Sequence, residues 1–357
     1  MRNWSSALHN DRIMEENYPH KRYNPLTNSW VLVSPHRTKR PWQGQVEKTV
    51  EDKRPAHDPT CYLCANNMRS NGERNPYYQD VYAFKNDFSA LLEDVPNEEN
   101  TEGGLFQSIS ERGLCKVICF SPRHDLTIPE MEESAIRKVV DLWCTEYEAL
   151  GSVDFIQYVQ IFENKGFIMG CSNPHPHGQI WASSSMPDEP LKKQMNQLAY
   201  FEKHQKTLLS DYLEKELEKN ERILFENAHF VGLVPFWATW PFEAMIIPKR
   251  PMARITDMTD AEKQAFANAY KHLTVLYDNL FQTSFPYSAG IHQAPTDGKE
   301  HAEWHWHKSF YPPLLRSATV KKFMVGYEMF ALPQRDITPE KAAEMLKGQS
   351  PVHFKNM

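Results

Sequence analysis

The sequence Asn173-Pro-His-Pro-His-Gly-Gln-Ile-Trp181 combines the features of a short strand with two histidines two positions apart. Because side chains alternate along a strand, His175 and His177 are expected to point to the same face. The proline between them stiffens the backbone, and Gly178 lets the chain pass close to a ligand. An imidazole held in this way can attack phosphorus and carry the phosphoryl group as a covalent adduct. Gln179 would supply a neutral amide donor for the phosphate oxygens.

A surface His-Pro-His turn without a function is the alternative interpretation of these residues. The glycine and glutamine that follow the histidines favour a functional site, as does the Cys-Ser-Asn-Pro loop that precedes them. We therefore treat this segment as the candidate active site.

The elements around this strand occur in the same order in both halves of the chain. Apolar residues at helical spacing predict a helix over residues 136–147, and a capping box at Thr259 predicts another that runs to about residue 280. Strands are predicted at residues 115–120, 155–162, 175–181, 229–234, 242–247, 287–291 and 304–311. The last strand of each half carries a His-x-His, which is His175/His177 first and His305/His307 second. We therefore expect an α+β fold made of a duplicated unit, with mostly antiparallel strands and helices packed on one face.

The pattern divides the chain into three parts. Residues 1–187 form the first half, residues 188–222 a helical connector without a strong break, and residues 223–357 the second half. The charged run within the connector is typical of a solvated helix face. Residues 93–103, which are rich in Glu, Asp, Asn, Pro and Gly, indicate a flexible loop.

Composition excludes several classes of protein. The chain has 357 residues, of which 41% are hydrophobic and 24% charged, so an intrinsically disordered chain is excluded. Its 40 Lys and Arg against 46 Asp and Glu give a net charge of −6, which disfavours tracking of a nucleic-acid backbone. No apolar run is long enough to span a bilayer, and the polar first 20 residues lack the apolar core of a signal peptide. With six cysteines, too few for a disulfide scaffold, we expect a cytoplasmic protein.

Residues 170–182 resemble the active-site signature of the galactose-1-phosphate uridylyltransferase family, a branch of the histidine-triad superfamily. The resemblance continues in the same order over most of residues 20–340. Its further segments are His36–Gly44, Phe84–Phe88, Val159–Gly166, Val234–Pro241, Tyr277–Phe281, Ser284–Tyr287, Tyr311–Val320 and Lys322–Glu328. It implies two histidine-triad-like units whose sheet forms a half-barrel.

The resemblance also implies a two-step exchange in galactose metabolism, within the Leloir pathway. UDP-glucose would give its UMP to His177 and release glucose 1-phosphate, and galactose 1-phosphate would then take the UMP to form UDP-galactose. Generic histidine-triad hydrolases carry a third histidine where this chain has Gln179, which favours transfer over hydrolysis.

The resemblance assigns the substrate contacts to four groups of residues. Arg37 and Arg40 would bind phosphate, and Asn86 and Asp87 would read the uracil or the ribose. Three residues of the loop region before the nucleophile would cradle the phosphates, namely Asn164, Gly170 and Ser172. A hexose-phosphate segment would consist of Lys322, Phe323, Val325, Tyr327, Glu328 and Gln334. In the family this segment reaches over from the partner subunit, which implies a homodimer with shared active sites.

Cys61-x-x-Cys64 has the spacing of half a zinc site, although a pair of reduced cysteines is the alternative. The resemblance adds His124 and His175 as the remaining ligands and implies one structural Zn²⁺ per chain. By fixing the position of His175, this site would orient His177 toward the phosphorus atom of the substrate.

A second metal site of the family uses one glutamate and three histidines. His292 and His307 match two of these positions, but Lys193 and Ser309 stand at the other two. Because an ammonium group repels a metal ion, we expect the second site to be empty. An alternative site that would use His305 and Glu303 is disfavoured.

Two other functions remain open on the sequence. One is a related nucleoside-diphosphate-sugar or dinucleotide phosphorylase or adenylyltransferase, which would use the same nucleophile with inorganic phosphate as the acceptor. The other is a non-catalytic nucleotide-sugar sensor. The replacement of two of the four ligands at the second metal site is the observation that suggests this alternative.

Overall fold

A nine-stranded antiparallel sheet forms the centre of the molecule. The computed structural model describes residues 17–39, 53–96 and 98–357. The strands lie in the order β3 (Tyr82–Lys85), β6 (Gly113–Cys119), β8 (His177–Ser183), β7 (Tyr158–Lys165), β12 (Tyr287–His292), β13 (His307–Tyr311), β11 (Ala244–Pro248), β10 (Phe230–Leu233) and β9 (Ile223–Glu226). Over the described residues β3 and β9 are the two edges, so the sheet is open rather than a closed barrel.

The order of elements confirms the duplicated α+β unit. The first half contributes β3 and β6, helix α2 (Glu133–Gly151), and then β7 and β8. The second half contributes β10 and β11, helix α5 (Asp260–Phe281), and then β12 and β13. The two units meet at the antiparallel pair of β7 and β12, where Gly290 lies opposite Phe162. A single sheet therefore carries both His-x-His segments, each at the start of the last strand of its unit.

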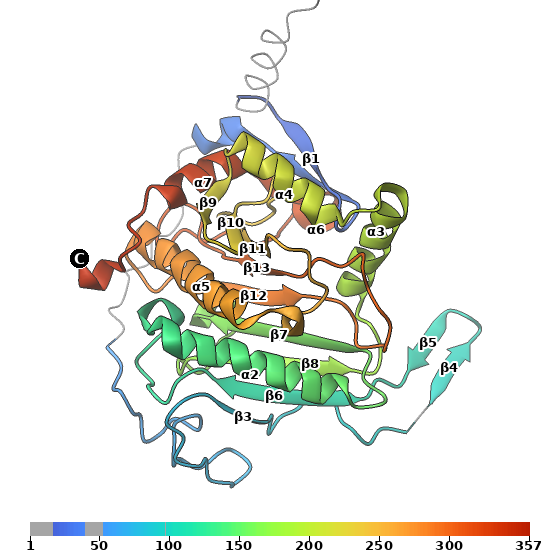
Figure 1. Cartoon of the computed structure of the whole chain (residues 1–357), viewed down its shortest axis with the longest axis vertical. Coiled ribbons are helices and arrows are strands. Elements are labelled where there is room, and N and C mark those ends of the chain that lie inside the picture. Colours follow the sequence, from blue (N-terminus) through green and yellow to red (C-terminus); the bar gives the residue numbers. More distant parts are fainter. Residues whose placement is uncertain (1–16, 40–52, 97) are drawn as a thin grey trace, which may run out of the picture.

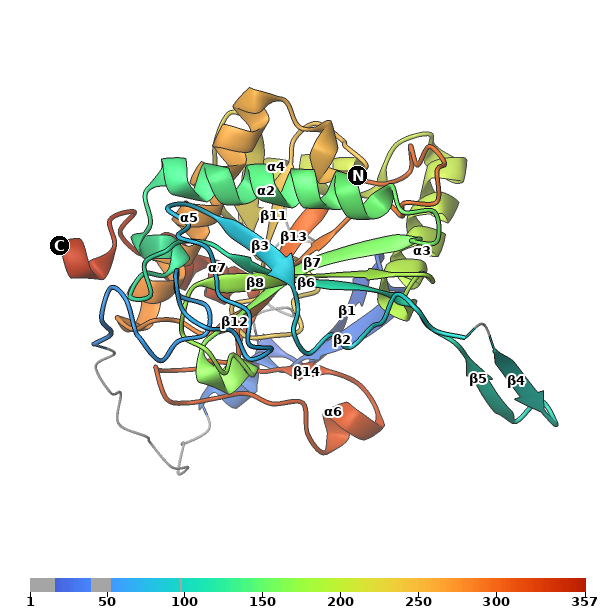
Figure 2. The same ribbon diagram turned by 90° about the horizontal axis from the view of Figure 1, so that it is seen from below.

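Helices α2 and α5 pack side by side on one face of this sheet (Figure 1). On α2, the predicted apolar stripe is buried, with Ile136, Val139 and Trp143 each at most 1% exposed. The predicted capping box begins α5: Thr259 Oγ1 accepts a hydrogen bond from the backbone N–H of Glu262, whose carboxylate accepts from the N–H of Thr259 at 2.8 Å. Seen from below, α2 lies above the sheet, and β1 (His20–Asn24), β2 (Ser29–Val33) and α6 (Tyr327–Phe330) lie beneath it (Figure 2).

The connector differs from the single unbroken helix that the sequence predicts. It forms α3 (Asp188–His204) and α4 (Leu208–Lys219), separated where Gln205 adopts a positive φ of 56°. Thr207 then caps α4 by accepting a hydrogen bond from the backbone N–H of Ser210. Leu208, Leu209 and Leu213 of α4 pack on side chains of β10 and β11 that face away from α5. The expected solvated face is also interrupted, because Lys193 on α3 is only 5% exposed.

Residues 93–103 are not the simple loop that their composition indicates. They lead into a hairpin of β4 (Glu99–Glu102) and β5 (Phe106–Ile109), which projects from the body of the molecule (Figure 1). Gly103 and Gly104 make the turn with φ of 60° and 70°, values that favour glycine. All eight strand residues of the hairpin are exposed. A strand that buries neither face needs no alternation of apolar and polar residues, so the sequence gives little sign of these two strands.

Two smaller elements complete the fold. Strand β14 (Gln334–Arg335) joins β2 in parallel, in a three-stranded sheet with β1. Helix α7 (Pro339–Lys347) begins after Thr338, whose side chain accepts a hydrogen bond from the backbone N–H of Lys341. No helix among the described residues is both long enough and apolar enough to cross a bilayer.

Trp143→Ala is expected to lower the free energy of unfolding by about 3–5 kcal/mol, because it leaves a cavity between the sheet and α5. Trp143 packs edge-on against Phe120 and lies 5.9 Å from the ring of Tyr270. Chemical denaturation monitored by circular dichroism measures the change. Trp30→Ala is the control, since Trp30 is 45% exposed and its loss should change stability little. Equal effects of the two substitutions would contradict this view of the core.

Candidate active site

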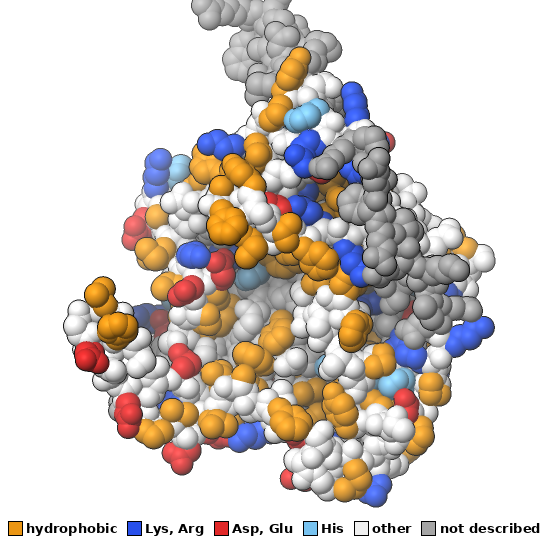
Figure 3. All heavy atoms as spheres, turned by 180° about the vertical axis from the view of Figure 1, so that it is seen from behind, with side chains coloured by type: hydrophobic (Ala, Val, Ile, Leu, Met, Phe, Trp, Pro, Cys, Tyr) orange, Lys and Arg blue, Asp and Glu red, His pale blue; other side chains and the backbone are white. Residues whose placement is uncertain are grey.

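The predicted nucleophile lies on the face of the sheet opposite to α2 and α5. Strand β8 is paired on both sides, with His177 opposite Cys119 on β6 and Gln179 opposite Phe162 on β7. Gly178 and Ile180 are buried toward the helices, so His177 and Gln179 project to the other side. This face is hollowed near its centre in the view from behind (Figure 3).

The ring of His177 is oriented by the backbone of the residue two positions before it. Its Nδ1 lies 2.7 Å from the carbonyl oxygen of His175. Because a carbonyl oxygen only accepts, Nδ1 carries the proton, and the lone pair of Nε2 stays available. Burial lowers the pKa of His177, so the ring is neutral at neutral pH. The geometry thus presents a neutral imidazole nitrogen for attack.

Gln179 is oriented in a similar way. Its Oε1 accepts a hydrogen bond of 3.0 Å from the indole N–H of Trp181 on the same face of β8. An indole nitrogen only donates, so this contact leaves the amide NH₂ of Gln179 as the group that can donate to a ligand.

Gly178 allows the nucleophile strand to pack tightly between its neighbours. A Cβ atom at this position would lie 2.8 Å from a ring carbon of Phe120 and 2.9 Å from the backbone oxygen of Phe162. Both separations are shorter than van der Waals contact. The close approach predicted for this glycine is therefore toward the protein core rather than toward a ligand.

The four predicted metal ligands come together in one buried cluster. The ligand atoms of Cys61, Cys64, His124 and His175 lie within 4.8 Å of one another. Cys64 Sγ is 3.6 Å from His124 Nδ1 and 3.5 Å from His175 Nδ1. Tetrahedral zinc with bonds of about 2.3 Å to sulfur and about 2.0 Å to nitrogen places such atoms about 3.5 Å apart. The cluster therefore fits a tetrahedral zinc ion.

Neighbouring groups orient these ligands toward a common point. His175 Nε2 lies 2.8 Å from the carbonyl oxygen of Ser121, so Nε2 carries the proton and Nδ1 keeps its lone pair for a metal. Asn173 donates from its amide to Cys61 Sγ at 3.4 Å and accepts from the backbone N–H of His175 at 3.0 Å. One ligand of the cluster, His175, therefore lies two residues before His177, the first residue of β8.

Thiolate sulfur and imidazole nitrogen are donors that Zn²⁺ prefers, but a thiol must lose its proton to bind the ion. Burial raises the pKa of the Cys64 thiol to about 12 when no cation is nearby. A bound Zn²⁺ would hold the thiolate form and link the segment of Cys61 and Cys64 to the start of β8.

Comparison with known proteins now identifies the family. The family model described as galactose-1-phosphate uridyl transferase, N-terminal domain, matches residues 10–187, and the one for the C-terminal domain matches residues 193–357. The chain belongs to the galactose-1-phosphate uridylyltransferase family. Members of this family are nucleotidyltransferases, which confirms that the protein is an enzyme of the predicted class.

Individual relatives match nearly the full chain. The galactose-1-phosphate uridylyltransferase of Haemophilus influenzae is 54% identical over 338 residues, covering 95% of this chain and 96% of that protein. The one of Rattus norvegicus is 49% identical over 340 residues, covering 94% and 89%.

Solved structures agree on the fold. A structure described as a uridylyltransferase has a TM-score of 0.74 and 27% identity, covering 92% of this chain and 97% of that one. An ADP-glucose phosphorylase from Arabidopsis thaliana has the same TM-score at 23% identity, covering 94% and 99%, and this likeness concerns the fold alone.

The predicted phosphate-binding residues lie partly around the nucleophile. Asn164 is on β7, next to β8, and its Oδ1 accepts a hydrogen bond of 2.7 Å from Ser288 on β12. Gly170 has a φ of 77°, and Ser172 is exposed in the loop that leads to β8. Arg40 lies outside the described residues.

The predicted base-reading and hexose-phosphate residues form local groups of their own. Asn86 accepts a hydrogen bond of 3.0 Å from the backbone N–H of Phe88, and Asp87 is paired with Arg69 at 3.5 Å. Lys322 pairs with Glu328, which also accepts from the backbone N–H of Gln334 at 3.0 Å.

Asp336 contacts two of the predicted site residues, although the sequence did not point to it. It accepts hydrogen bonds from Arg37 at 3.0 Å and from Gln334 at 2.7 Å, and so joins two of the predicted substrate groups. Its position two residues after Gln334 is the one signal in the sequence that could have pointed to it.

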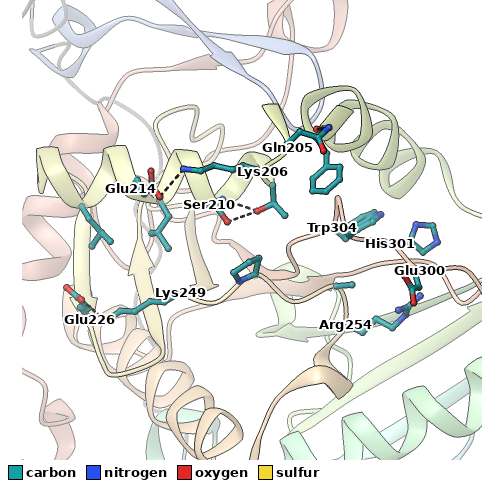
Figure 4. Close-up of a pocket in the computed structure, with 17 residues that line it drawn as sticks. Gln205, Lys206, Ser210, Glu214, Glu226, Lys249, Arg254, Glu300, His301 and Trp304 are labelled. Carbon is teal, nitrogen blue, oxygen red and sulfur yellow. Dashed lines mark hydrogen bonds and ion pairs between the residues drawn. The ribbon is translucent and has the colours of Figure 1, made fainter. Parts of the chain in front are cut away.

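A pocket of about 780 Å³ lies elsewhere, between α4 and the loops around residues 249–254 and 300–304 (Figure 4). Its walls include Trp304 and the cations Lys206 and Lys249, and they contain none of the predicted site residues. Each of these two lysines is already paired with a carboxylate, Lys206 with Glu214 at 3.5 Å and Lys249 with Glu226 at 2.6 Å. The predicted reactive residues therefore lie on the open face of the sheet and not in this pocket.

Gly178→Ala is expected to destabilise the protein by about 1–3 kcal/mol and to reduce nucleotidyl transfer, because the new methyl group must displace β8. Thermal unfolding and the transfer rate are the measurements. Gly348→Ala, at the end of α7, is the control, since its Cβ would lie no closer than 3.4 Å to another atom. A Gly178→Ala protein with normal stability and rate would show that the packing around β8 can accommodate an additional methyl group.

Proposed function

We propose that the protein transfers UMP from UDP-glucose to galactose 1-phosphate through a uridylyl-histidine intermediate. In the first step Nε2 of His177 attacks the α-phosphorus of UDP-glucose, and the bond from that phosphorus to the bridging oxygen breaks. Glucose 1-phosphate leaves with the electron pair of that bond. In the second step a phosphate oxygen of galactose 1-phosphate attacks the same phosphorus and releases His177 with UDP-galactose.

The observation that carries this proposal is the orientation of His177. Its Nδ1–H donates to a backbone carbonyl oxygen, so the opposite nitrogen keeps its lone pair. The same hydrogen bond stabilises the positive charge that the ring gains when Nε2 bonds to phosphorus. Gln179 projects from the same face and would donate to the phosphoryl oxygens on which charge develops.

The other substrate contacts are assigned by their position. Asn164, Gly170 and Ser172 would bind the phosphates near the nucleophile, and Arg37 and Arg40 would neutralise their charge. Asn86 and Asp87 would bind the uridine. The division into residues 1–187, 188–222 and 223–357 is part of the same proposal, and the two family matches at 10–187 and 193–357 support it.

The active site is proposed to be completed by a second copy of the chain. Lys322 and Glu328 hold the hexose-phosphate segment together, but Phe323, Val325 and Tyr327 are 51–61% exposed. A segment with its apolar side chains turned outward is suited to reach into a partner's site. The protein is therefore proposed to work as a homodimer, and in the cytoplasm, where its six free cysteines would stay reduced.

One structural Zn²⁺ is proposed at Cys61, Cys64, His124 and His175. It would hold the residue directly before the proline of the His-Pro-His segment, and so orient the carbonyl of His175 that His177 binds. No second metal is expected, because Lys193 and Ser309 occupy two of the four positions that the family uses.

Intact-protein mass spectrometry tests the transfer. Mixing with UDP-glucose should add the mass of one UMP, and galactose 1-phosphate should then remove it with formation of UDP-galactose. His177→Ala should abolish both changes, whereas His204→Ala, at the exposed end of α3, should leave them intact.

Two other outcomes would point to other functions. An adduct that only inorganic phosphate discharges would favour a phosphorylase. Binding of UDP-glucose without any adduct would favour a non-catalytic sensor.

Cys64→Ser is expected to lower the zinc content from about one ion per chain to near zero, and to lower the melting temperature, because a structural zinc site stabilises the fold. Metal analysis by mass spectrometry after dialysis provides the count. Cys171→Ser is the control, since Cys171 lies outside the cluster. Full zinc retention in Cys64→Ser would disprove the assigned ligand set.

A further inference from the structure

Parallel strands bring two of the predicted substrate groups next to each other. Strand β14 pairs in parallel with β2 beneath the main sheet, and Gln334 lies opposite Leu32 (Figure 2). At the end of this pair, the backbone N–H of Ser34 donates to the carbonyl oxygen of Arg335 at 2.7 Å. Because the two strands run in the same direction, the residues that follow them leave from the same end of the sheet. The chain after β2 and the chain after β14 are therefore neighbours.

Arg37 lies in the turn that follows β2. A short 3₁₀ helix of Pro35–Lys39 begins one residue after the strand, and the backbone N–H of Arg37 donates to the carbonyl oxygen of Ser34 at 3.1 Å. Thr38 closes the turn by donating from Oγ1 to the carbonyl oxygen of Pro35 at 2.7 Å. Local hydrogen bonds thus fix the backbone that carries Arg37, although its side chain is 45% exposed.

Asp336, the first residue after β14, connects the two groups through one carboxylate oxygen. Its Oδ1 accepts a hydrogen bond from Nε of Arg37 at 3.0 Å and another from Nε2 of Gln334 at 2.7 Å. Gln334 and Asp336 are two positions apart in extended chain, so their side chains share a face, whereas Arg335 between them is buried. The alternation of the strand therefore places the carboxylate between its two partners.

The chemistry of a carboxylate decides which atoms of these partners stay available. A carboxylate only accepts hydrogen bonds, so Gln334 turns its NH₂ group toward Asp336 and its amide oxygen away from it. Arg37 meets the carboxylate with Nε, which leaves the two terminal nitrogens of its guanidinium outside this contact. An acceptor suited to a sugar hydroxyl and donors suited to a phosphate are thus presented side by side.

A second carboxylate holds the backbone of the same residue. Glu328 accepts a hydrogen bond of 3.0 Å from the backbone N–H of Gln334, and it pairs with Lys322. Gln334 is therefore held by Glu328 through its backbone and by Asp336 through its side chain. The contact with Asp336 is the one that determines how the amide is turned.

We propose that Asp336 is a positioning residue, which holds the guanidinium of Arg37 and the amide of Gln334 in one orientation for the phosphate and the sugar of the same ligand. A hexose 1-phosphate, free or as part of UDP-glucose, carries these two groups next to each other. Asp336 itself would not touch the substrate. This inference rests on the proposed function, because that function assigns phosphate to Arg37 and the hexose phosphate to Gln334.

Calorimetric titration with UDP-glucose tests the positioning in a His177→Ala background, in which no transfer consumes the ligand. Asp336→Ala should raise the Kd for UDP-glucose about tenfold, because it releases both partners of the carboxylate. Asp336→Asn should raise the Kd less, since its amide oxygen can still accept a hydrogen bond. UDP, which lacks the hexose, should lose less affinity than UDP-glucose in Asp336→Ala.

Glu344→Ala is the matched control. Glu344 is also a carboxylate next to a cation, but it pairs with Lys341 on the surface of α7 at 2.8 Å. Its loss should leave the Kd for UDP-glucose unchanged. The melting temperature of the Asp336 variants should stay close to that of their parent, because an ion pair as exposed as that of Arg37 and Asp336 contributes little to folding.

A double-mutant cycle shows whether Asp336 acts through Gln334. Asp336→Ala and Gln334→Ala together should weaken binding of UDP-glucose by less than the product of their separate effects. Full additivity would overturn the proposal, as would an unchanged Kd in a folded Asp336→Ala protein.

Failure of the proposed function gives a different result. A wild-type protein that forms no uridylyl adduct, but whose Asp336 variants lose affinity for UDP-glucose as expected, would refute the transfer and support the positioning. A wild-type protein that does not bind UDP-glucose would overturn both.

Discussion

The hydrogen bond between the ring of His177 and the carbonyl oxygen of His175 is the constraint on which the proposed active site depends. It joins the first residue of β8 to the residue two positions before that strand, so its geometry depends on how firmly the start of β8 is held. Pairing of β8 with β6 and β7 holds the strand from both sides, and the Cys/His cluster holds its beginning. The sheet, the metal cluster and Gly178 therefore all act on the same imidazole, since each limits how β8 can move.

The two halves of the molecule show how one framework serves two purposes. Each unit ends in a strand whose first residues form a His-x-His, and in each the second ring is turned by the carbonyl of the first. In the first unit the hollow face leaves His177 accessible to a ligand. In the second unit the equivalent His307 is completely buried. Burial removes this ring from solvent, so it is not accessible to a ligand in the way that His177 is.

Charges buried in the core show a second consequence of this packing. Lys308 on β13 is fully buried, and its Nζ lies 3.2 Å from Glu163 on β7. The same ammonium lies 4.8 Å from the rings of both Trp143 and Tyr270. An ion pair of this kind joins the strands of the two units beneath the helices, while the aromatic rings around it offset part of the cost of removing the charge from water.

Local sequence was sufficient for the features that depend on short spacings. Alternation, helical period and ligand spacing are properties of a few consecutive residues. The sequence therefore predicted the strand at 175–181, the apolar stripe of α2, the capping box of α5 and the Cys-x-x-Cys pair. The duplicated unit followed from the order of these elements, and the family resemblance supplied His124, which no spacing would connect to Cys61.

Other features were decided by contacts between distant segments. The break at Gln205 and the burial of Lys193 depend on how α3 and α4 lie on the sheet. The pairing of Lys308 with Glu163 and of Asp336 with Arg37 joins residues more than a hundred positions apart. The sequence does not show whether a charged side chain is solvated or paired with a buried partner. The packing of the tertiary structure decides between these two environments.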